Sequence, residues 1–190
     1  GGPTYVMGDE ESYGYLIGTE VRDKDAISAA LLTAEMALYH VSQGKTVLTR
    51  LNELYAQFGY FEEKTISTYF RGQAGAKVMA QMMDDLRKKP PRSLGGITVD
   101  RVRDVQAGTM KQMPQGTPVE DIDLPSSNVL QFFLEDGTVV SARPSGTEPK
   151  IKFYISVPSP PGTPLKEATA DVAKRLKAID NDIQSWIPEE

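Results

Sequence analysis

Residues 143–157 read RPSGTEPKIKFYISV, and our prediction of the fold starts from this stretch. From Ile151 to Val157 every second residue is apolar, which predicts a strand with one buried face. The preceding residues, 143–150, contain two prolines and a glycine, so they predict a loop with little conformational freedom. The stretch therefore predicts a rigid loop that leads directly into a half-buried strand.

The loop carries several groups that bind anions. Arg143 offers a planar guanidinium with five donors, which suits a phosphate. Ser145 and Thr147 add hydroxyls, and Gly146 lets a ligand approach the backbone N–H groups closely. We interpret the loop as a phosphate-binding loop. The alternative is an ordinary Pro-Ser-Gly turn beside a solvated arginine.

Composition restricts the class of protein. The chain has 190 residues, 39% apolar and 25% charged, which is typical of a globular protein with one or two domains. Its net charge of −5 disfavours a general nucleic-acid binder or a binder of anionic membranes. The absence of cysteine excludes disulfides, thiolate zinc sites and cysteine nucleophiles. No apolar run approaches a membrane span and no signal peptide opens the chain, so we expect a cytoplasmic protein.

The first 60 residues predict a short strand and two helices. Residues 8–14 are polar and predict a loop, and Tyr15–Thr19 follow as a strand. Asp25 is placed to cap a helix whose apolar residues recur at helical spacing until Gly44. A second helix runs from Thr46 to Gly59. These elements are too few to close a core alone.

After residue 60 the pattern changes to strands with two long helices. The Asp-Gly pair at 136–137 predicts a hairpin between residues 128–134 and 138–142. Residues 107–127 have no periodicity and predict a loop. The remaining elements are a strand at 61–70, a helix at 73–89, a strand at 97–105 and a closing helix at 165–186. No parallel crossover is required, so we expect an α+β unit with an antiparallel sheet.

A second candidate site lies near the start of the chain. Glu10 and Ser12 supply a carboxylate and a hydroxyl, the acceptors and donors that sugar hydroxyls require. The alternative is a helix cap or a solvated acidic loop. The segment Arg22-Asp23-Lys24-Asp25 follows, with the charged start of a helix as its simpler interpretation.

The string RPSGTEPKIKFY resembles the phosphate-binding loop of the last domain in the α-D-phosphohexomutase family, which contains phosphoglucomutases and phosphomannomutases. The Glu-x-Ser motif resembles the sugar-recognition loop of that family's third domain, and residues 22–25 resemble its Arg-acid-Lys-Asp segment. Many members continue with Gly-His after the serine, whereas this chain has Tyr13-Gly14-Tyr15. The preference for glucose or mannose therefore stays open.

The resemblance implies a role for each matching residue. Glu10 and Ser12 would bind ring hydroxyls, and Lys24 and Arg22 would contact phosphate or sugar oxygens. In the loop and its strand, the resemblance implies phosphate contacts from six residues: Arg143, Ser145, Gly146, Thr147, Lys152 and Lys150. His40, the only histidine, lacks a partner at a recognisable spacing, and we assign it no catalytic role.

The resemblance also implies the domain organisation. Residues 1–60 would be the C-terminal part of the third, α/β domain. Residues 61–190 would form the C-terminal phosphate-binding domain, a four-stranded antiparallel sheet with two helices on one face, as in the TATA-binding protein. The family's phosphoserine loop and its Asp-Gly-Asp-x-Asp loop, which holds Mg²⁺, are both missing from the sequence. We therefore expect a C-terminal fragment whose partners are the N-terminal domains of the same polypeptide and a hexose phosphate.

The reaction implied for the parent protein moves phosphate between C1 and C6 of a hexose phosphate. A phosphoserine donates its phosphate, and a hexose 1,6-bisphosphate serves as intermediate and activator. We expect no catalytic residue and no metal ligand in this fragment. The alternative function is a non-catalytic sugar-phosphate-binding or interaction module.

Overall fold

The computed structural model describes residues 4–10, 13–146 and 148–187. Its contacts divide the chain into two compact units, residues 1–54 and 55–190. Helix α2, Val47–Phe58, begins in the first unit and ends in the second. The assignment of residues 1–60 and 61–190 to two domains stays a prediction.

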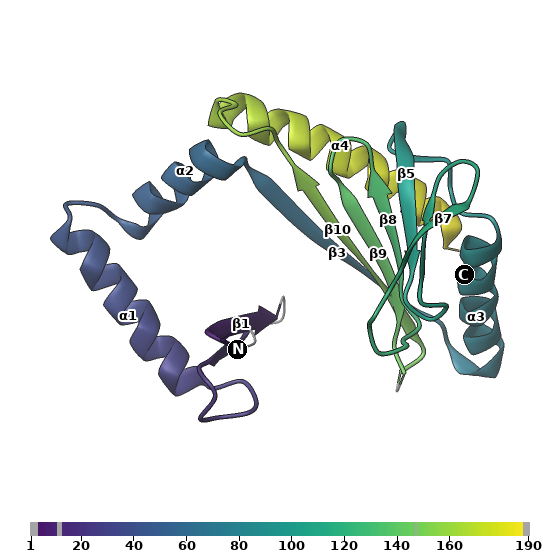
Figure 1. Cartoon of the computed structure of the whole chain (residues 1–190), viewed down its shortest axis with the longest axis horizontal. Coiled ribbons are helices and arrows are strands. Elements are labelled where there is room, and N and C mark those ends of the chain that lie inside the picture. The colour runs from purple at the N-terminus through teal and green to yellow at the C-terminus, as the bar shows by residue number, and fades with distance from the viewer. Residues whose placement is uncertain (1–3, 11–12, 147, 188–190) are drawn as a thin grey trace. The chain divides into compact units, whose positions relative to one another are not determined.

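The first unit contains a short hairpin and helix α1, Ala26–Ser42 (Figure 1). Strand β1, Met7–Glu10, pairs antiparallel with β2, Gly14–Ile17. The predicted loop at residues 8–14 was therefore wrong in its first part, which is a strand. The predicted cap is confirmed: Asp25 accepts hydrogen bonds from the backbone N–H groups of Ile27 and Ser28, at 3.1 and 3.3 Å.

Helices α1 and α2 leave most of their apolar side chains exposed. In α1, Leu31 and Leu38 are 62% and 70% exposed, and neither α1 nor α2 has a buried residue. Every buried apolar side chain of the described residues lies at Ile66 or beyond. Residues 4–10 and 13–54 therefore form no hydrophobic core of their own, as the small number of elements predicted.

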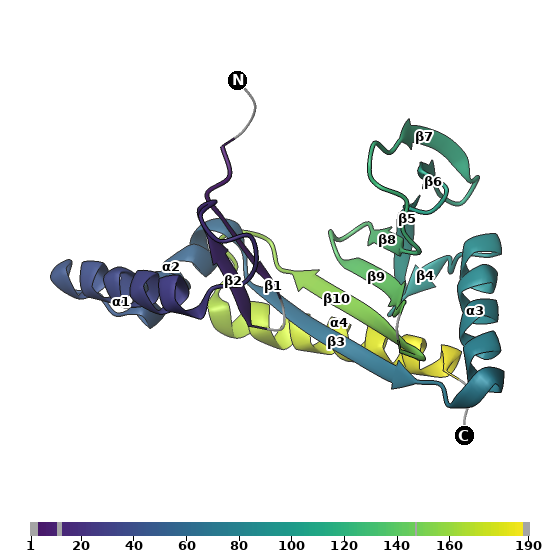
Figure 2. The same ribbon diagram turned by 90° about the horizontal axis from the view of Figure 1, so that it is seen from below.

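The second unit is built on an antiparallel sheet (Figures 1 and 2). Among the described residues the sheet has eight strands, of which seven follow one path and β4, Ser93–Leu94, pairs with β5 at the side. Along the path the strands are β3 (Phe61–Tyr69), β10 (Lys150–Pro158), β9 (Val139–Pro144), β8 (Leu130–Leu134), β5 (Ile97–Asp104), β6 (Thr109–Gln112) and β7 (Thr117–Asp121).

The predicted α+β class with an antiparallel sheet is confirmed, but the number of strands is not four. Residues 107–127, which we expected to be a loop, contain β6 and β7. Figure 2 shows these two strands curling away from the rest of the sheet. All five residues of β7 are exposed, so its sequence has no alternation that could reveal a strand.

Alternation of side chains along the strands separates a core face from an open face. In β10, Ile151, Phe153, Ile155 and Val157 are at most 1% exposed, whereas the residues between them are half-buried. Helices α3 (Gly72–Lys88) and α4 (Leu165–Trp186) contribute buried side chains to the same core as these strand residues. Neither helix therefore covers the face that presents Lys150, Lys152 and Tyr154.

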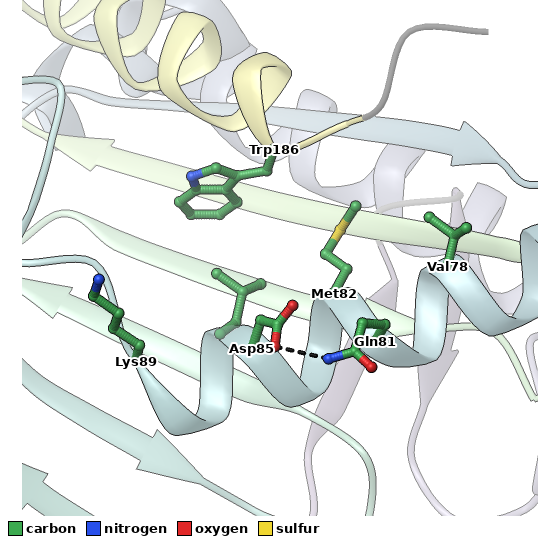
Figure 3. Close-up of a pocket in the computed structure, with 7 residues that line it drawn as sticks. Val78, Gln81, Met82, Asp85, Lys89 and Trp186 are labelled. Atoms are coloured by element: carbon green, nitrogen blue, oxygen red, sulfur yellow. Dashed lines mark hydrogen bonds between the residues drawn. The ribbon is translucent and has the colours of Figure 1, made fainter.

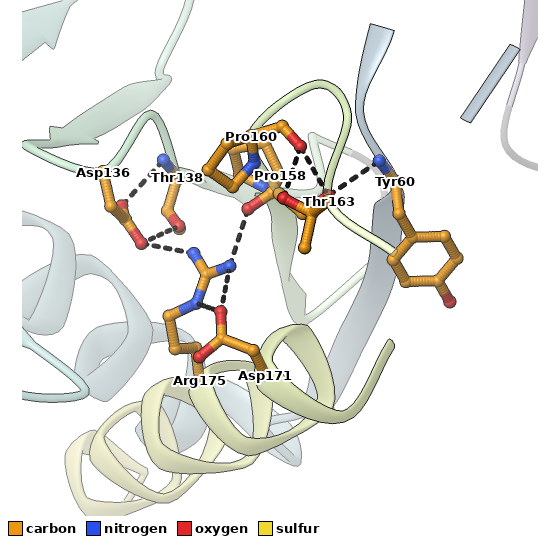
Figure 4. Close-up of polar contacts among 9 residues, drawn as sticks. Tyr60, Asp136, Thr138, Pro158, Pro160, Thr163, Asp171 and Arg175 are labelled. Atoms are coloured by element: carbon orange, nitrogen blue, oxygen red, sulfur yellow. Dashed lines mark hydrogen bonds and ion pairs between the residues drawn. The ribbon is translucent and has the colours of Figure 1, made fainter. Parts of the chain in front are cut away.

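A polar network connects α4 to the end of the sheet (Figure 4). The guanidinium of Arg175 donates to Asp136 at 2.6 Å, to the backbone oxygen of Pro158 at 2.7 Å and to Asp171 at 2.8 Å. Asp136 also accepts from the backbone N–H of Thr138 at 2.9 Å. One arginine thus links the β8–β9 turn, the end of β10 and α4.

The entry into the sheet depends on Gly59, which has φ +97°. A Cβ atom at this position would overlap the backbone oxygen of Ser159. The adjacent Tyr60 makes two hydrogen bonds with Ser159: its N–H donates to the Ser159 side-chain Oγ at 2.9 Å, and its backbone oxygen accepts from the Ser159 N–H at 2.7 Å. The close approach of the two backbones therefore requires glycine.

Across the described ranges, no helix is long and apolar enough to cross a membrane.

Candidate functional site

The open face of the sheet brings the predicted anion-binding residues together. Arg143 on β9 and Lys152 on β10 are directly opposite each other in the strand register, and Ile151 is opposite Pro144. Residues opposite each other in an antiparallel pair point to the same side of the sheet, with Cβ atoms about 5 Å apart. The two cations therefore project from the open face at the point where the loop joins its two strands.

A hollow of about 330 Å³ lies at this point. Of the residues that we predicted, Arg143, Ser145, Gly146, Lys150 and Lys152 line it. Thr147 lies outside the described residues. Five of the six predicted phosphate contacts thus share one hollow.

Three hydrogen bonds, two between backbone groups and one to a side chain, connect the ends of the loop. The N–H of Ser145 donates to the oxygen of Lys150 at 2.8 Å, and the N–H of Lys150 donates to the oxygen of Glu148 at 2.7 Å. The N–H of Glu148 donates to the Oγ of Ser145 at 3.2 Å. The loop ends are therefore fixed before any ligand arrives, which lowers the entropy cost of binding.

The three cations in the hollow differ in their surroundings. Lys150 forms an ion pair with Glu148, and its ammonium lies 5.5 Å from the centre of the Tyr69 ring. The hydrogen bond that the Lys150 ammonium donates to the Glu148 carboxylate raises the pKa of Lys150. Lys152 lies 5.7 Å from the centre of the Tyr154 ring. Within the part of the chain that the structure describes, the exposed Arg143 side chain has no ion pair or hydrogen bond, so its donors are available to a ligand.

Three residues that line this hollow were not among the predicted contacts: Pro144, Glu148 and Tyr154. Tyr154 lies two positions after Lys152, so the strand alternation already placed it on the same face. Glu148 lies within the loop motif itself, but its acidic side chain has the wrong charge for an anion site. Its pairing with Lys150 can be recognised only in the structure.

The first unit has a separate hollow of about 290 Å³ that brings Glu10, Arg22 and Lys24 together. The Lys24 ammonium lies 3.1 Å from Asp23 and 3.5 Å from Glu10. The carboxylate of Asp23, and after it that of Glu10, raises the pKa of Lys24. Ser12, the other predicted sugar contact, lies outside the described residues.

The local backbone explains how Lys24 reaches Glu10. Gly14 is opposite Glu10 in the hairpin, and a Cβ on Gly14 would lie 2.7 Å from the Cγ of Lys24. The N–H of Asp25 donates to the oxygen of Tyr15 at 2.8 Å, which ties the start of α1 to β2. The glycine therefore leaves room for the lysine stem, and the hydrogen bond holds the lysine beside the hairpin.

A third hollow, of about 440 Å³, lies between α3 and the end of α4 (Figure 3). Its walls are mainly apolar and include Met82, Leu86 and Trp186. Two of its polar side chains, Gln81 and Asp85, are hydrogen-bonded to each other at 2.8 Å. A catalytic site usually has a few polar groups that converge on one point, and the lining of this hollow lacks such a group of free polar side chains.

The residues present do not fit a magnesium site. Throughout residues 4–10, 13–146 and 148–187, no three histidine, aspartate or glutamate side chains gather closely enough to hold a metal ion. Mg²⁺ is held by several oxygen ligands, usually including carboxylates. No chemical step through a metal is therefore assigned to these residues.

Comparison with known proteins gives matches over most of the chain. Residues 2–58 match the model of phosphoglucomutase/phosphomannomutase alpha/beta/alpha domain III, and residues 79–179 match that of the phosphoglucomutase/phosphomannomutase C-terminal domain. A phosphoglucomutase of Staphylococcus haemolyticus (strain JCSC1435) is 36% identical over 155 residues, which are 81% of this chain and 28% of the relative. A phosphoglucomutase of Staphylococcus aureus (strain MRSA252) is 34% identical over 174 residues, which are 92% of this chain and 30% of the relative. The chain thus spans under a third of the length of these curated relatives.

Proposed function

The chain belongs to the phosphoglucomutase/phosphomannomutase family, and from this premise we propose that it supplies phosphate- and sugar-binding surfaces to a phosphosugar mutase. The whole protein would move phosphate between C1 and C6 of a hexose phosphate. It would do so through a phosphoserine and a hexose 1,6-bisphosphate intermediate. The phosphoserine and Mg²⁺ loops would come from other domains of the same polypeptide, because neither string occurs in these 190 residues.

The observation that carries this proposal is the placement of Arg143 opposite Lys152 beside a closed, hydroxyl-bearing loop. Five predicted phosphate contacts line one hollow on the open face of the sheet. Arginine and lysine make charge-assisted hydrogen bonds to phosphate, which are about twice as strong as neutral ones. The hollow would therefore hold whichever phosphate of the intermediate is not reacting.

The hollow of the first unit supports the sugar-binding part of the proposal. Glu10 offers a carboxylate that accepts from ring hydroxyls, and Lys24 and Arg22 offer donors. Ser12 would add an adaptable hydroxyl. Because the intermediate must be accepted in two orientations, a few exposed polar groups suit the task better than a tightly shaped pocket. Binding energy from the remote phosphate and the ring would position the reacting phosphate.

Calorimetric titration of glucose 1,6-bisphosphate into the purified chain tests the proposal. We expect saturable binding that weakens as salt rises, because charged groups dominate the contact. Glucose, which carries no phosphate, serves as the control ligand and should bind far more weakly. Equal binding of the two sugars, or no binding of the bisphosphate, would refute the proposal.

A further inference from the structure

A fourth hollow, of about 220 Å³, lies on the opposite face of the sheet from the phosphate loop. It is bounded by the end of α3, by the β5–β6 ladder and by the turn after β6. In this ladder Val102 is opposite Lys111, and Asp104 is opposite Thr109. All four residues line the hollow. Because Val102 belongs to the core, the hollow opens on the core face of the sheet, beside the helices.

The floor of the hollow is apolar. Val102 and Leu130 are 5% and 0% exposed, and Met113 and Pro114 form another part of the lining. Met113 also packs against the main core. An apolar body placed here would therefore be removed from water on several sides, which stabilises binding by about 25 cal/mol for each Å² buried.

The carboxylate in the lining, that of Asp104, has its negative charge balanced by a neighbouring arginine. Asp104 is 8% exposed and accepts from the Nε of Arg87 at 3.0 Å. It also accepts from the backbone N–H groups of Gln106 and Ala107, at 3.1 and 3.3 Å. A second nitrogen of Arg87 donates to Asn128 at 2.5 Å. The buried acid and its arginine thus form a satisfied structural pair that leaves little charge for a ligand.

The two lysines in the lining have no acidic partner among the described residues. Lys88, in the last turn of α3, and Lys111, on β6, are both exposed. Neither has an ion pair or a hydrogen bond from its side chain within the described parts of the chain. The hollow therefore combines an apolar floor with two uncompensated positive charges.

We propose that this hollow binds a small organic carboxylate with a compact apolar body, such as one aromatic ring. The volume is below the roughly 300–1,000 Å³ of sites for drug-sized ligands, so it suits a ligand of one ring. The flexible ammonium groups provide point charges without the planar fork or the cluster of backbone donors that would favour a phosphate. Being on the other face of the sheet, the site is separate from the phosphate loop and does not depend on the proposed function.

The test uses benzoate as the probe and the methionine methyl groups as reporters. The protein is labelled with ¹³C in its methionine methyl groups, and the Met113 signal is assigned with a Met113→Leu variant. Sodium benzoate is titrated at constant ionic strength, with benzyl alcohol as the uncharged control. We expect the methyl signal of Met113 to shift and saturate with a Kd on the order of 1 mM. Benzyl alcohol should shift this signal much less. The methyl signal of Met82, which lies in the hollow beside Trp186, should not shift.

Charge removal provides the decisive comparison. The double variant Lys88→Gln/Lys111→Gln should weaken benzoate binding about two- to thirtyfold, since exposed ion pairs contribute about 0.2–1 kcal/mol each. The matched control is Lys166→Gln, an exposed lysine on α4, which should leave the Kd unchanged. A salt titration of the wild-type protein gives a second measurement that needs no variant, and added salt should weaken binding. A Met113 shift that does not saturate, equal binding of benzyl alcohol, or an unchanged Kd in the double variant or in high salt would overturn the proposal.

Discussion

Arg143 and Lys152 face each other across strands β9 and β10, directly before the chain leaves the sheet for the 145–149 loop. This pairing of two cations would destabilise an ordinary strand pair, because like charges directly opposite each other repel. The two cations lie at the mouth of a hollow rather than over the core. An anion bound in the hollow would reduce the repulsion between them, so the pair is suited to a phosphate dianion.

The isolated chain should not interconvert glucose 1-phosphate and glucose 6-phosphate. It contains no phosphoserine loop and no Asp-Gly-Asp-x-Asp string, so it has no group that could store the phosphate between the two transfers. A coupled mutase assay with Mg²⁺ and glucose 1,6-bisphosphate checks this expectation. Turnover near the ~10 per second of ordinary enzymes would contradict it.

Replacing Glu148 by glutamine should strengthen the binding of phosphate-bearing sugars about two- to fivefold, on the scale of an exposed ion pair. The change removes a negative charge from the wall of the hollow and releases Lys150 from its ion pair. The pKa of Lys150, which Glu148 raises, should fall toward its ordinary value, and the ammonium should stay protonated at pH 7. Calorimetric titration of glucose 1,6-bisphosphate checks the prediction, with Glu167→Gln as a distant control. Weaker binding in the Glu148 variant would mean that the carboxylate helps to hold the sugar.

Replacing Arg175 by methionine should destabilise the second unit by about 2–4 kcal/mol. The change removes three hydrogen bonds from a side chain that is 17% exposed and leaves Asp136 without its cation. The measurement is urea unfolding followed by circular dichroism. Lys174→Met, at an exposed position of the same helix, provides the control. A loss below about 0.5 kcal/mol, the size of an ordinary surface substitution, would show that the network is dispensable.

The sequence predicted those parts of the fold whose periodicity reflects burial. Alternation in residues 151–157 located β10 and its two faces, and the string RPSGTEPKIKFY at residues 143–154 identified the family correctly. The strand β7 escaped prediction because it has no buried face. The helical spacing in α1 predicted the helix, but the exposure of Leu31 and Leu38 shows that periodicity does not specify what covers an apolar face.

The sequence predicted those residues of the candidate site that belong to the motif and also line a hollow. These are Arg143, Ser145, Gly146, Lys150 and Lys152. Residues that act through a partner could not be recognised in the same way. The Glu148–Lys150 ion pair and the contact of Lys150 with Tyr69 depend on the folding of the loop and on the pairing of β3 with β10.

Replacing Arg143 by alanine should weaken the binding of glucose 1,6-bisphosphate roughly ten- to hundredfold, while the fold stays intact. A charge-assisted hydrogen bond to phosphate contributes about 1.5–3 kcal/mol, which corresponds to that change in Kd. Arg143→Lys should recover only part of the affinity, since an ammonium keeps the charge but not the planar fork. Thermal stability should change little, because the side chain is exposed and supports no core.

Calorimetric titrations and melting curves of the wild type and both variants separate a binding role from a structural one. Arg101→Ala is a matched control, because Arg101 is an exposed arginine of the same sheet that does not line the hollow. It should leave the affinity for the bisphosphate unchanged. If Arg143→Ala binds as tightly as the wild type, the loop does not use its arginine to hold phosphate. If the same variant melts at a much lower temperature, Arg143 stabilises the strand pair, and the assignment of the hollow to phosphate loses its main support.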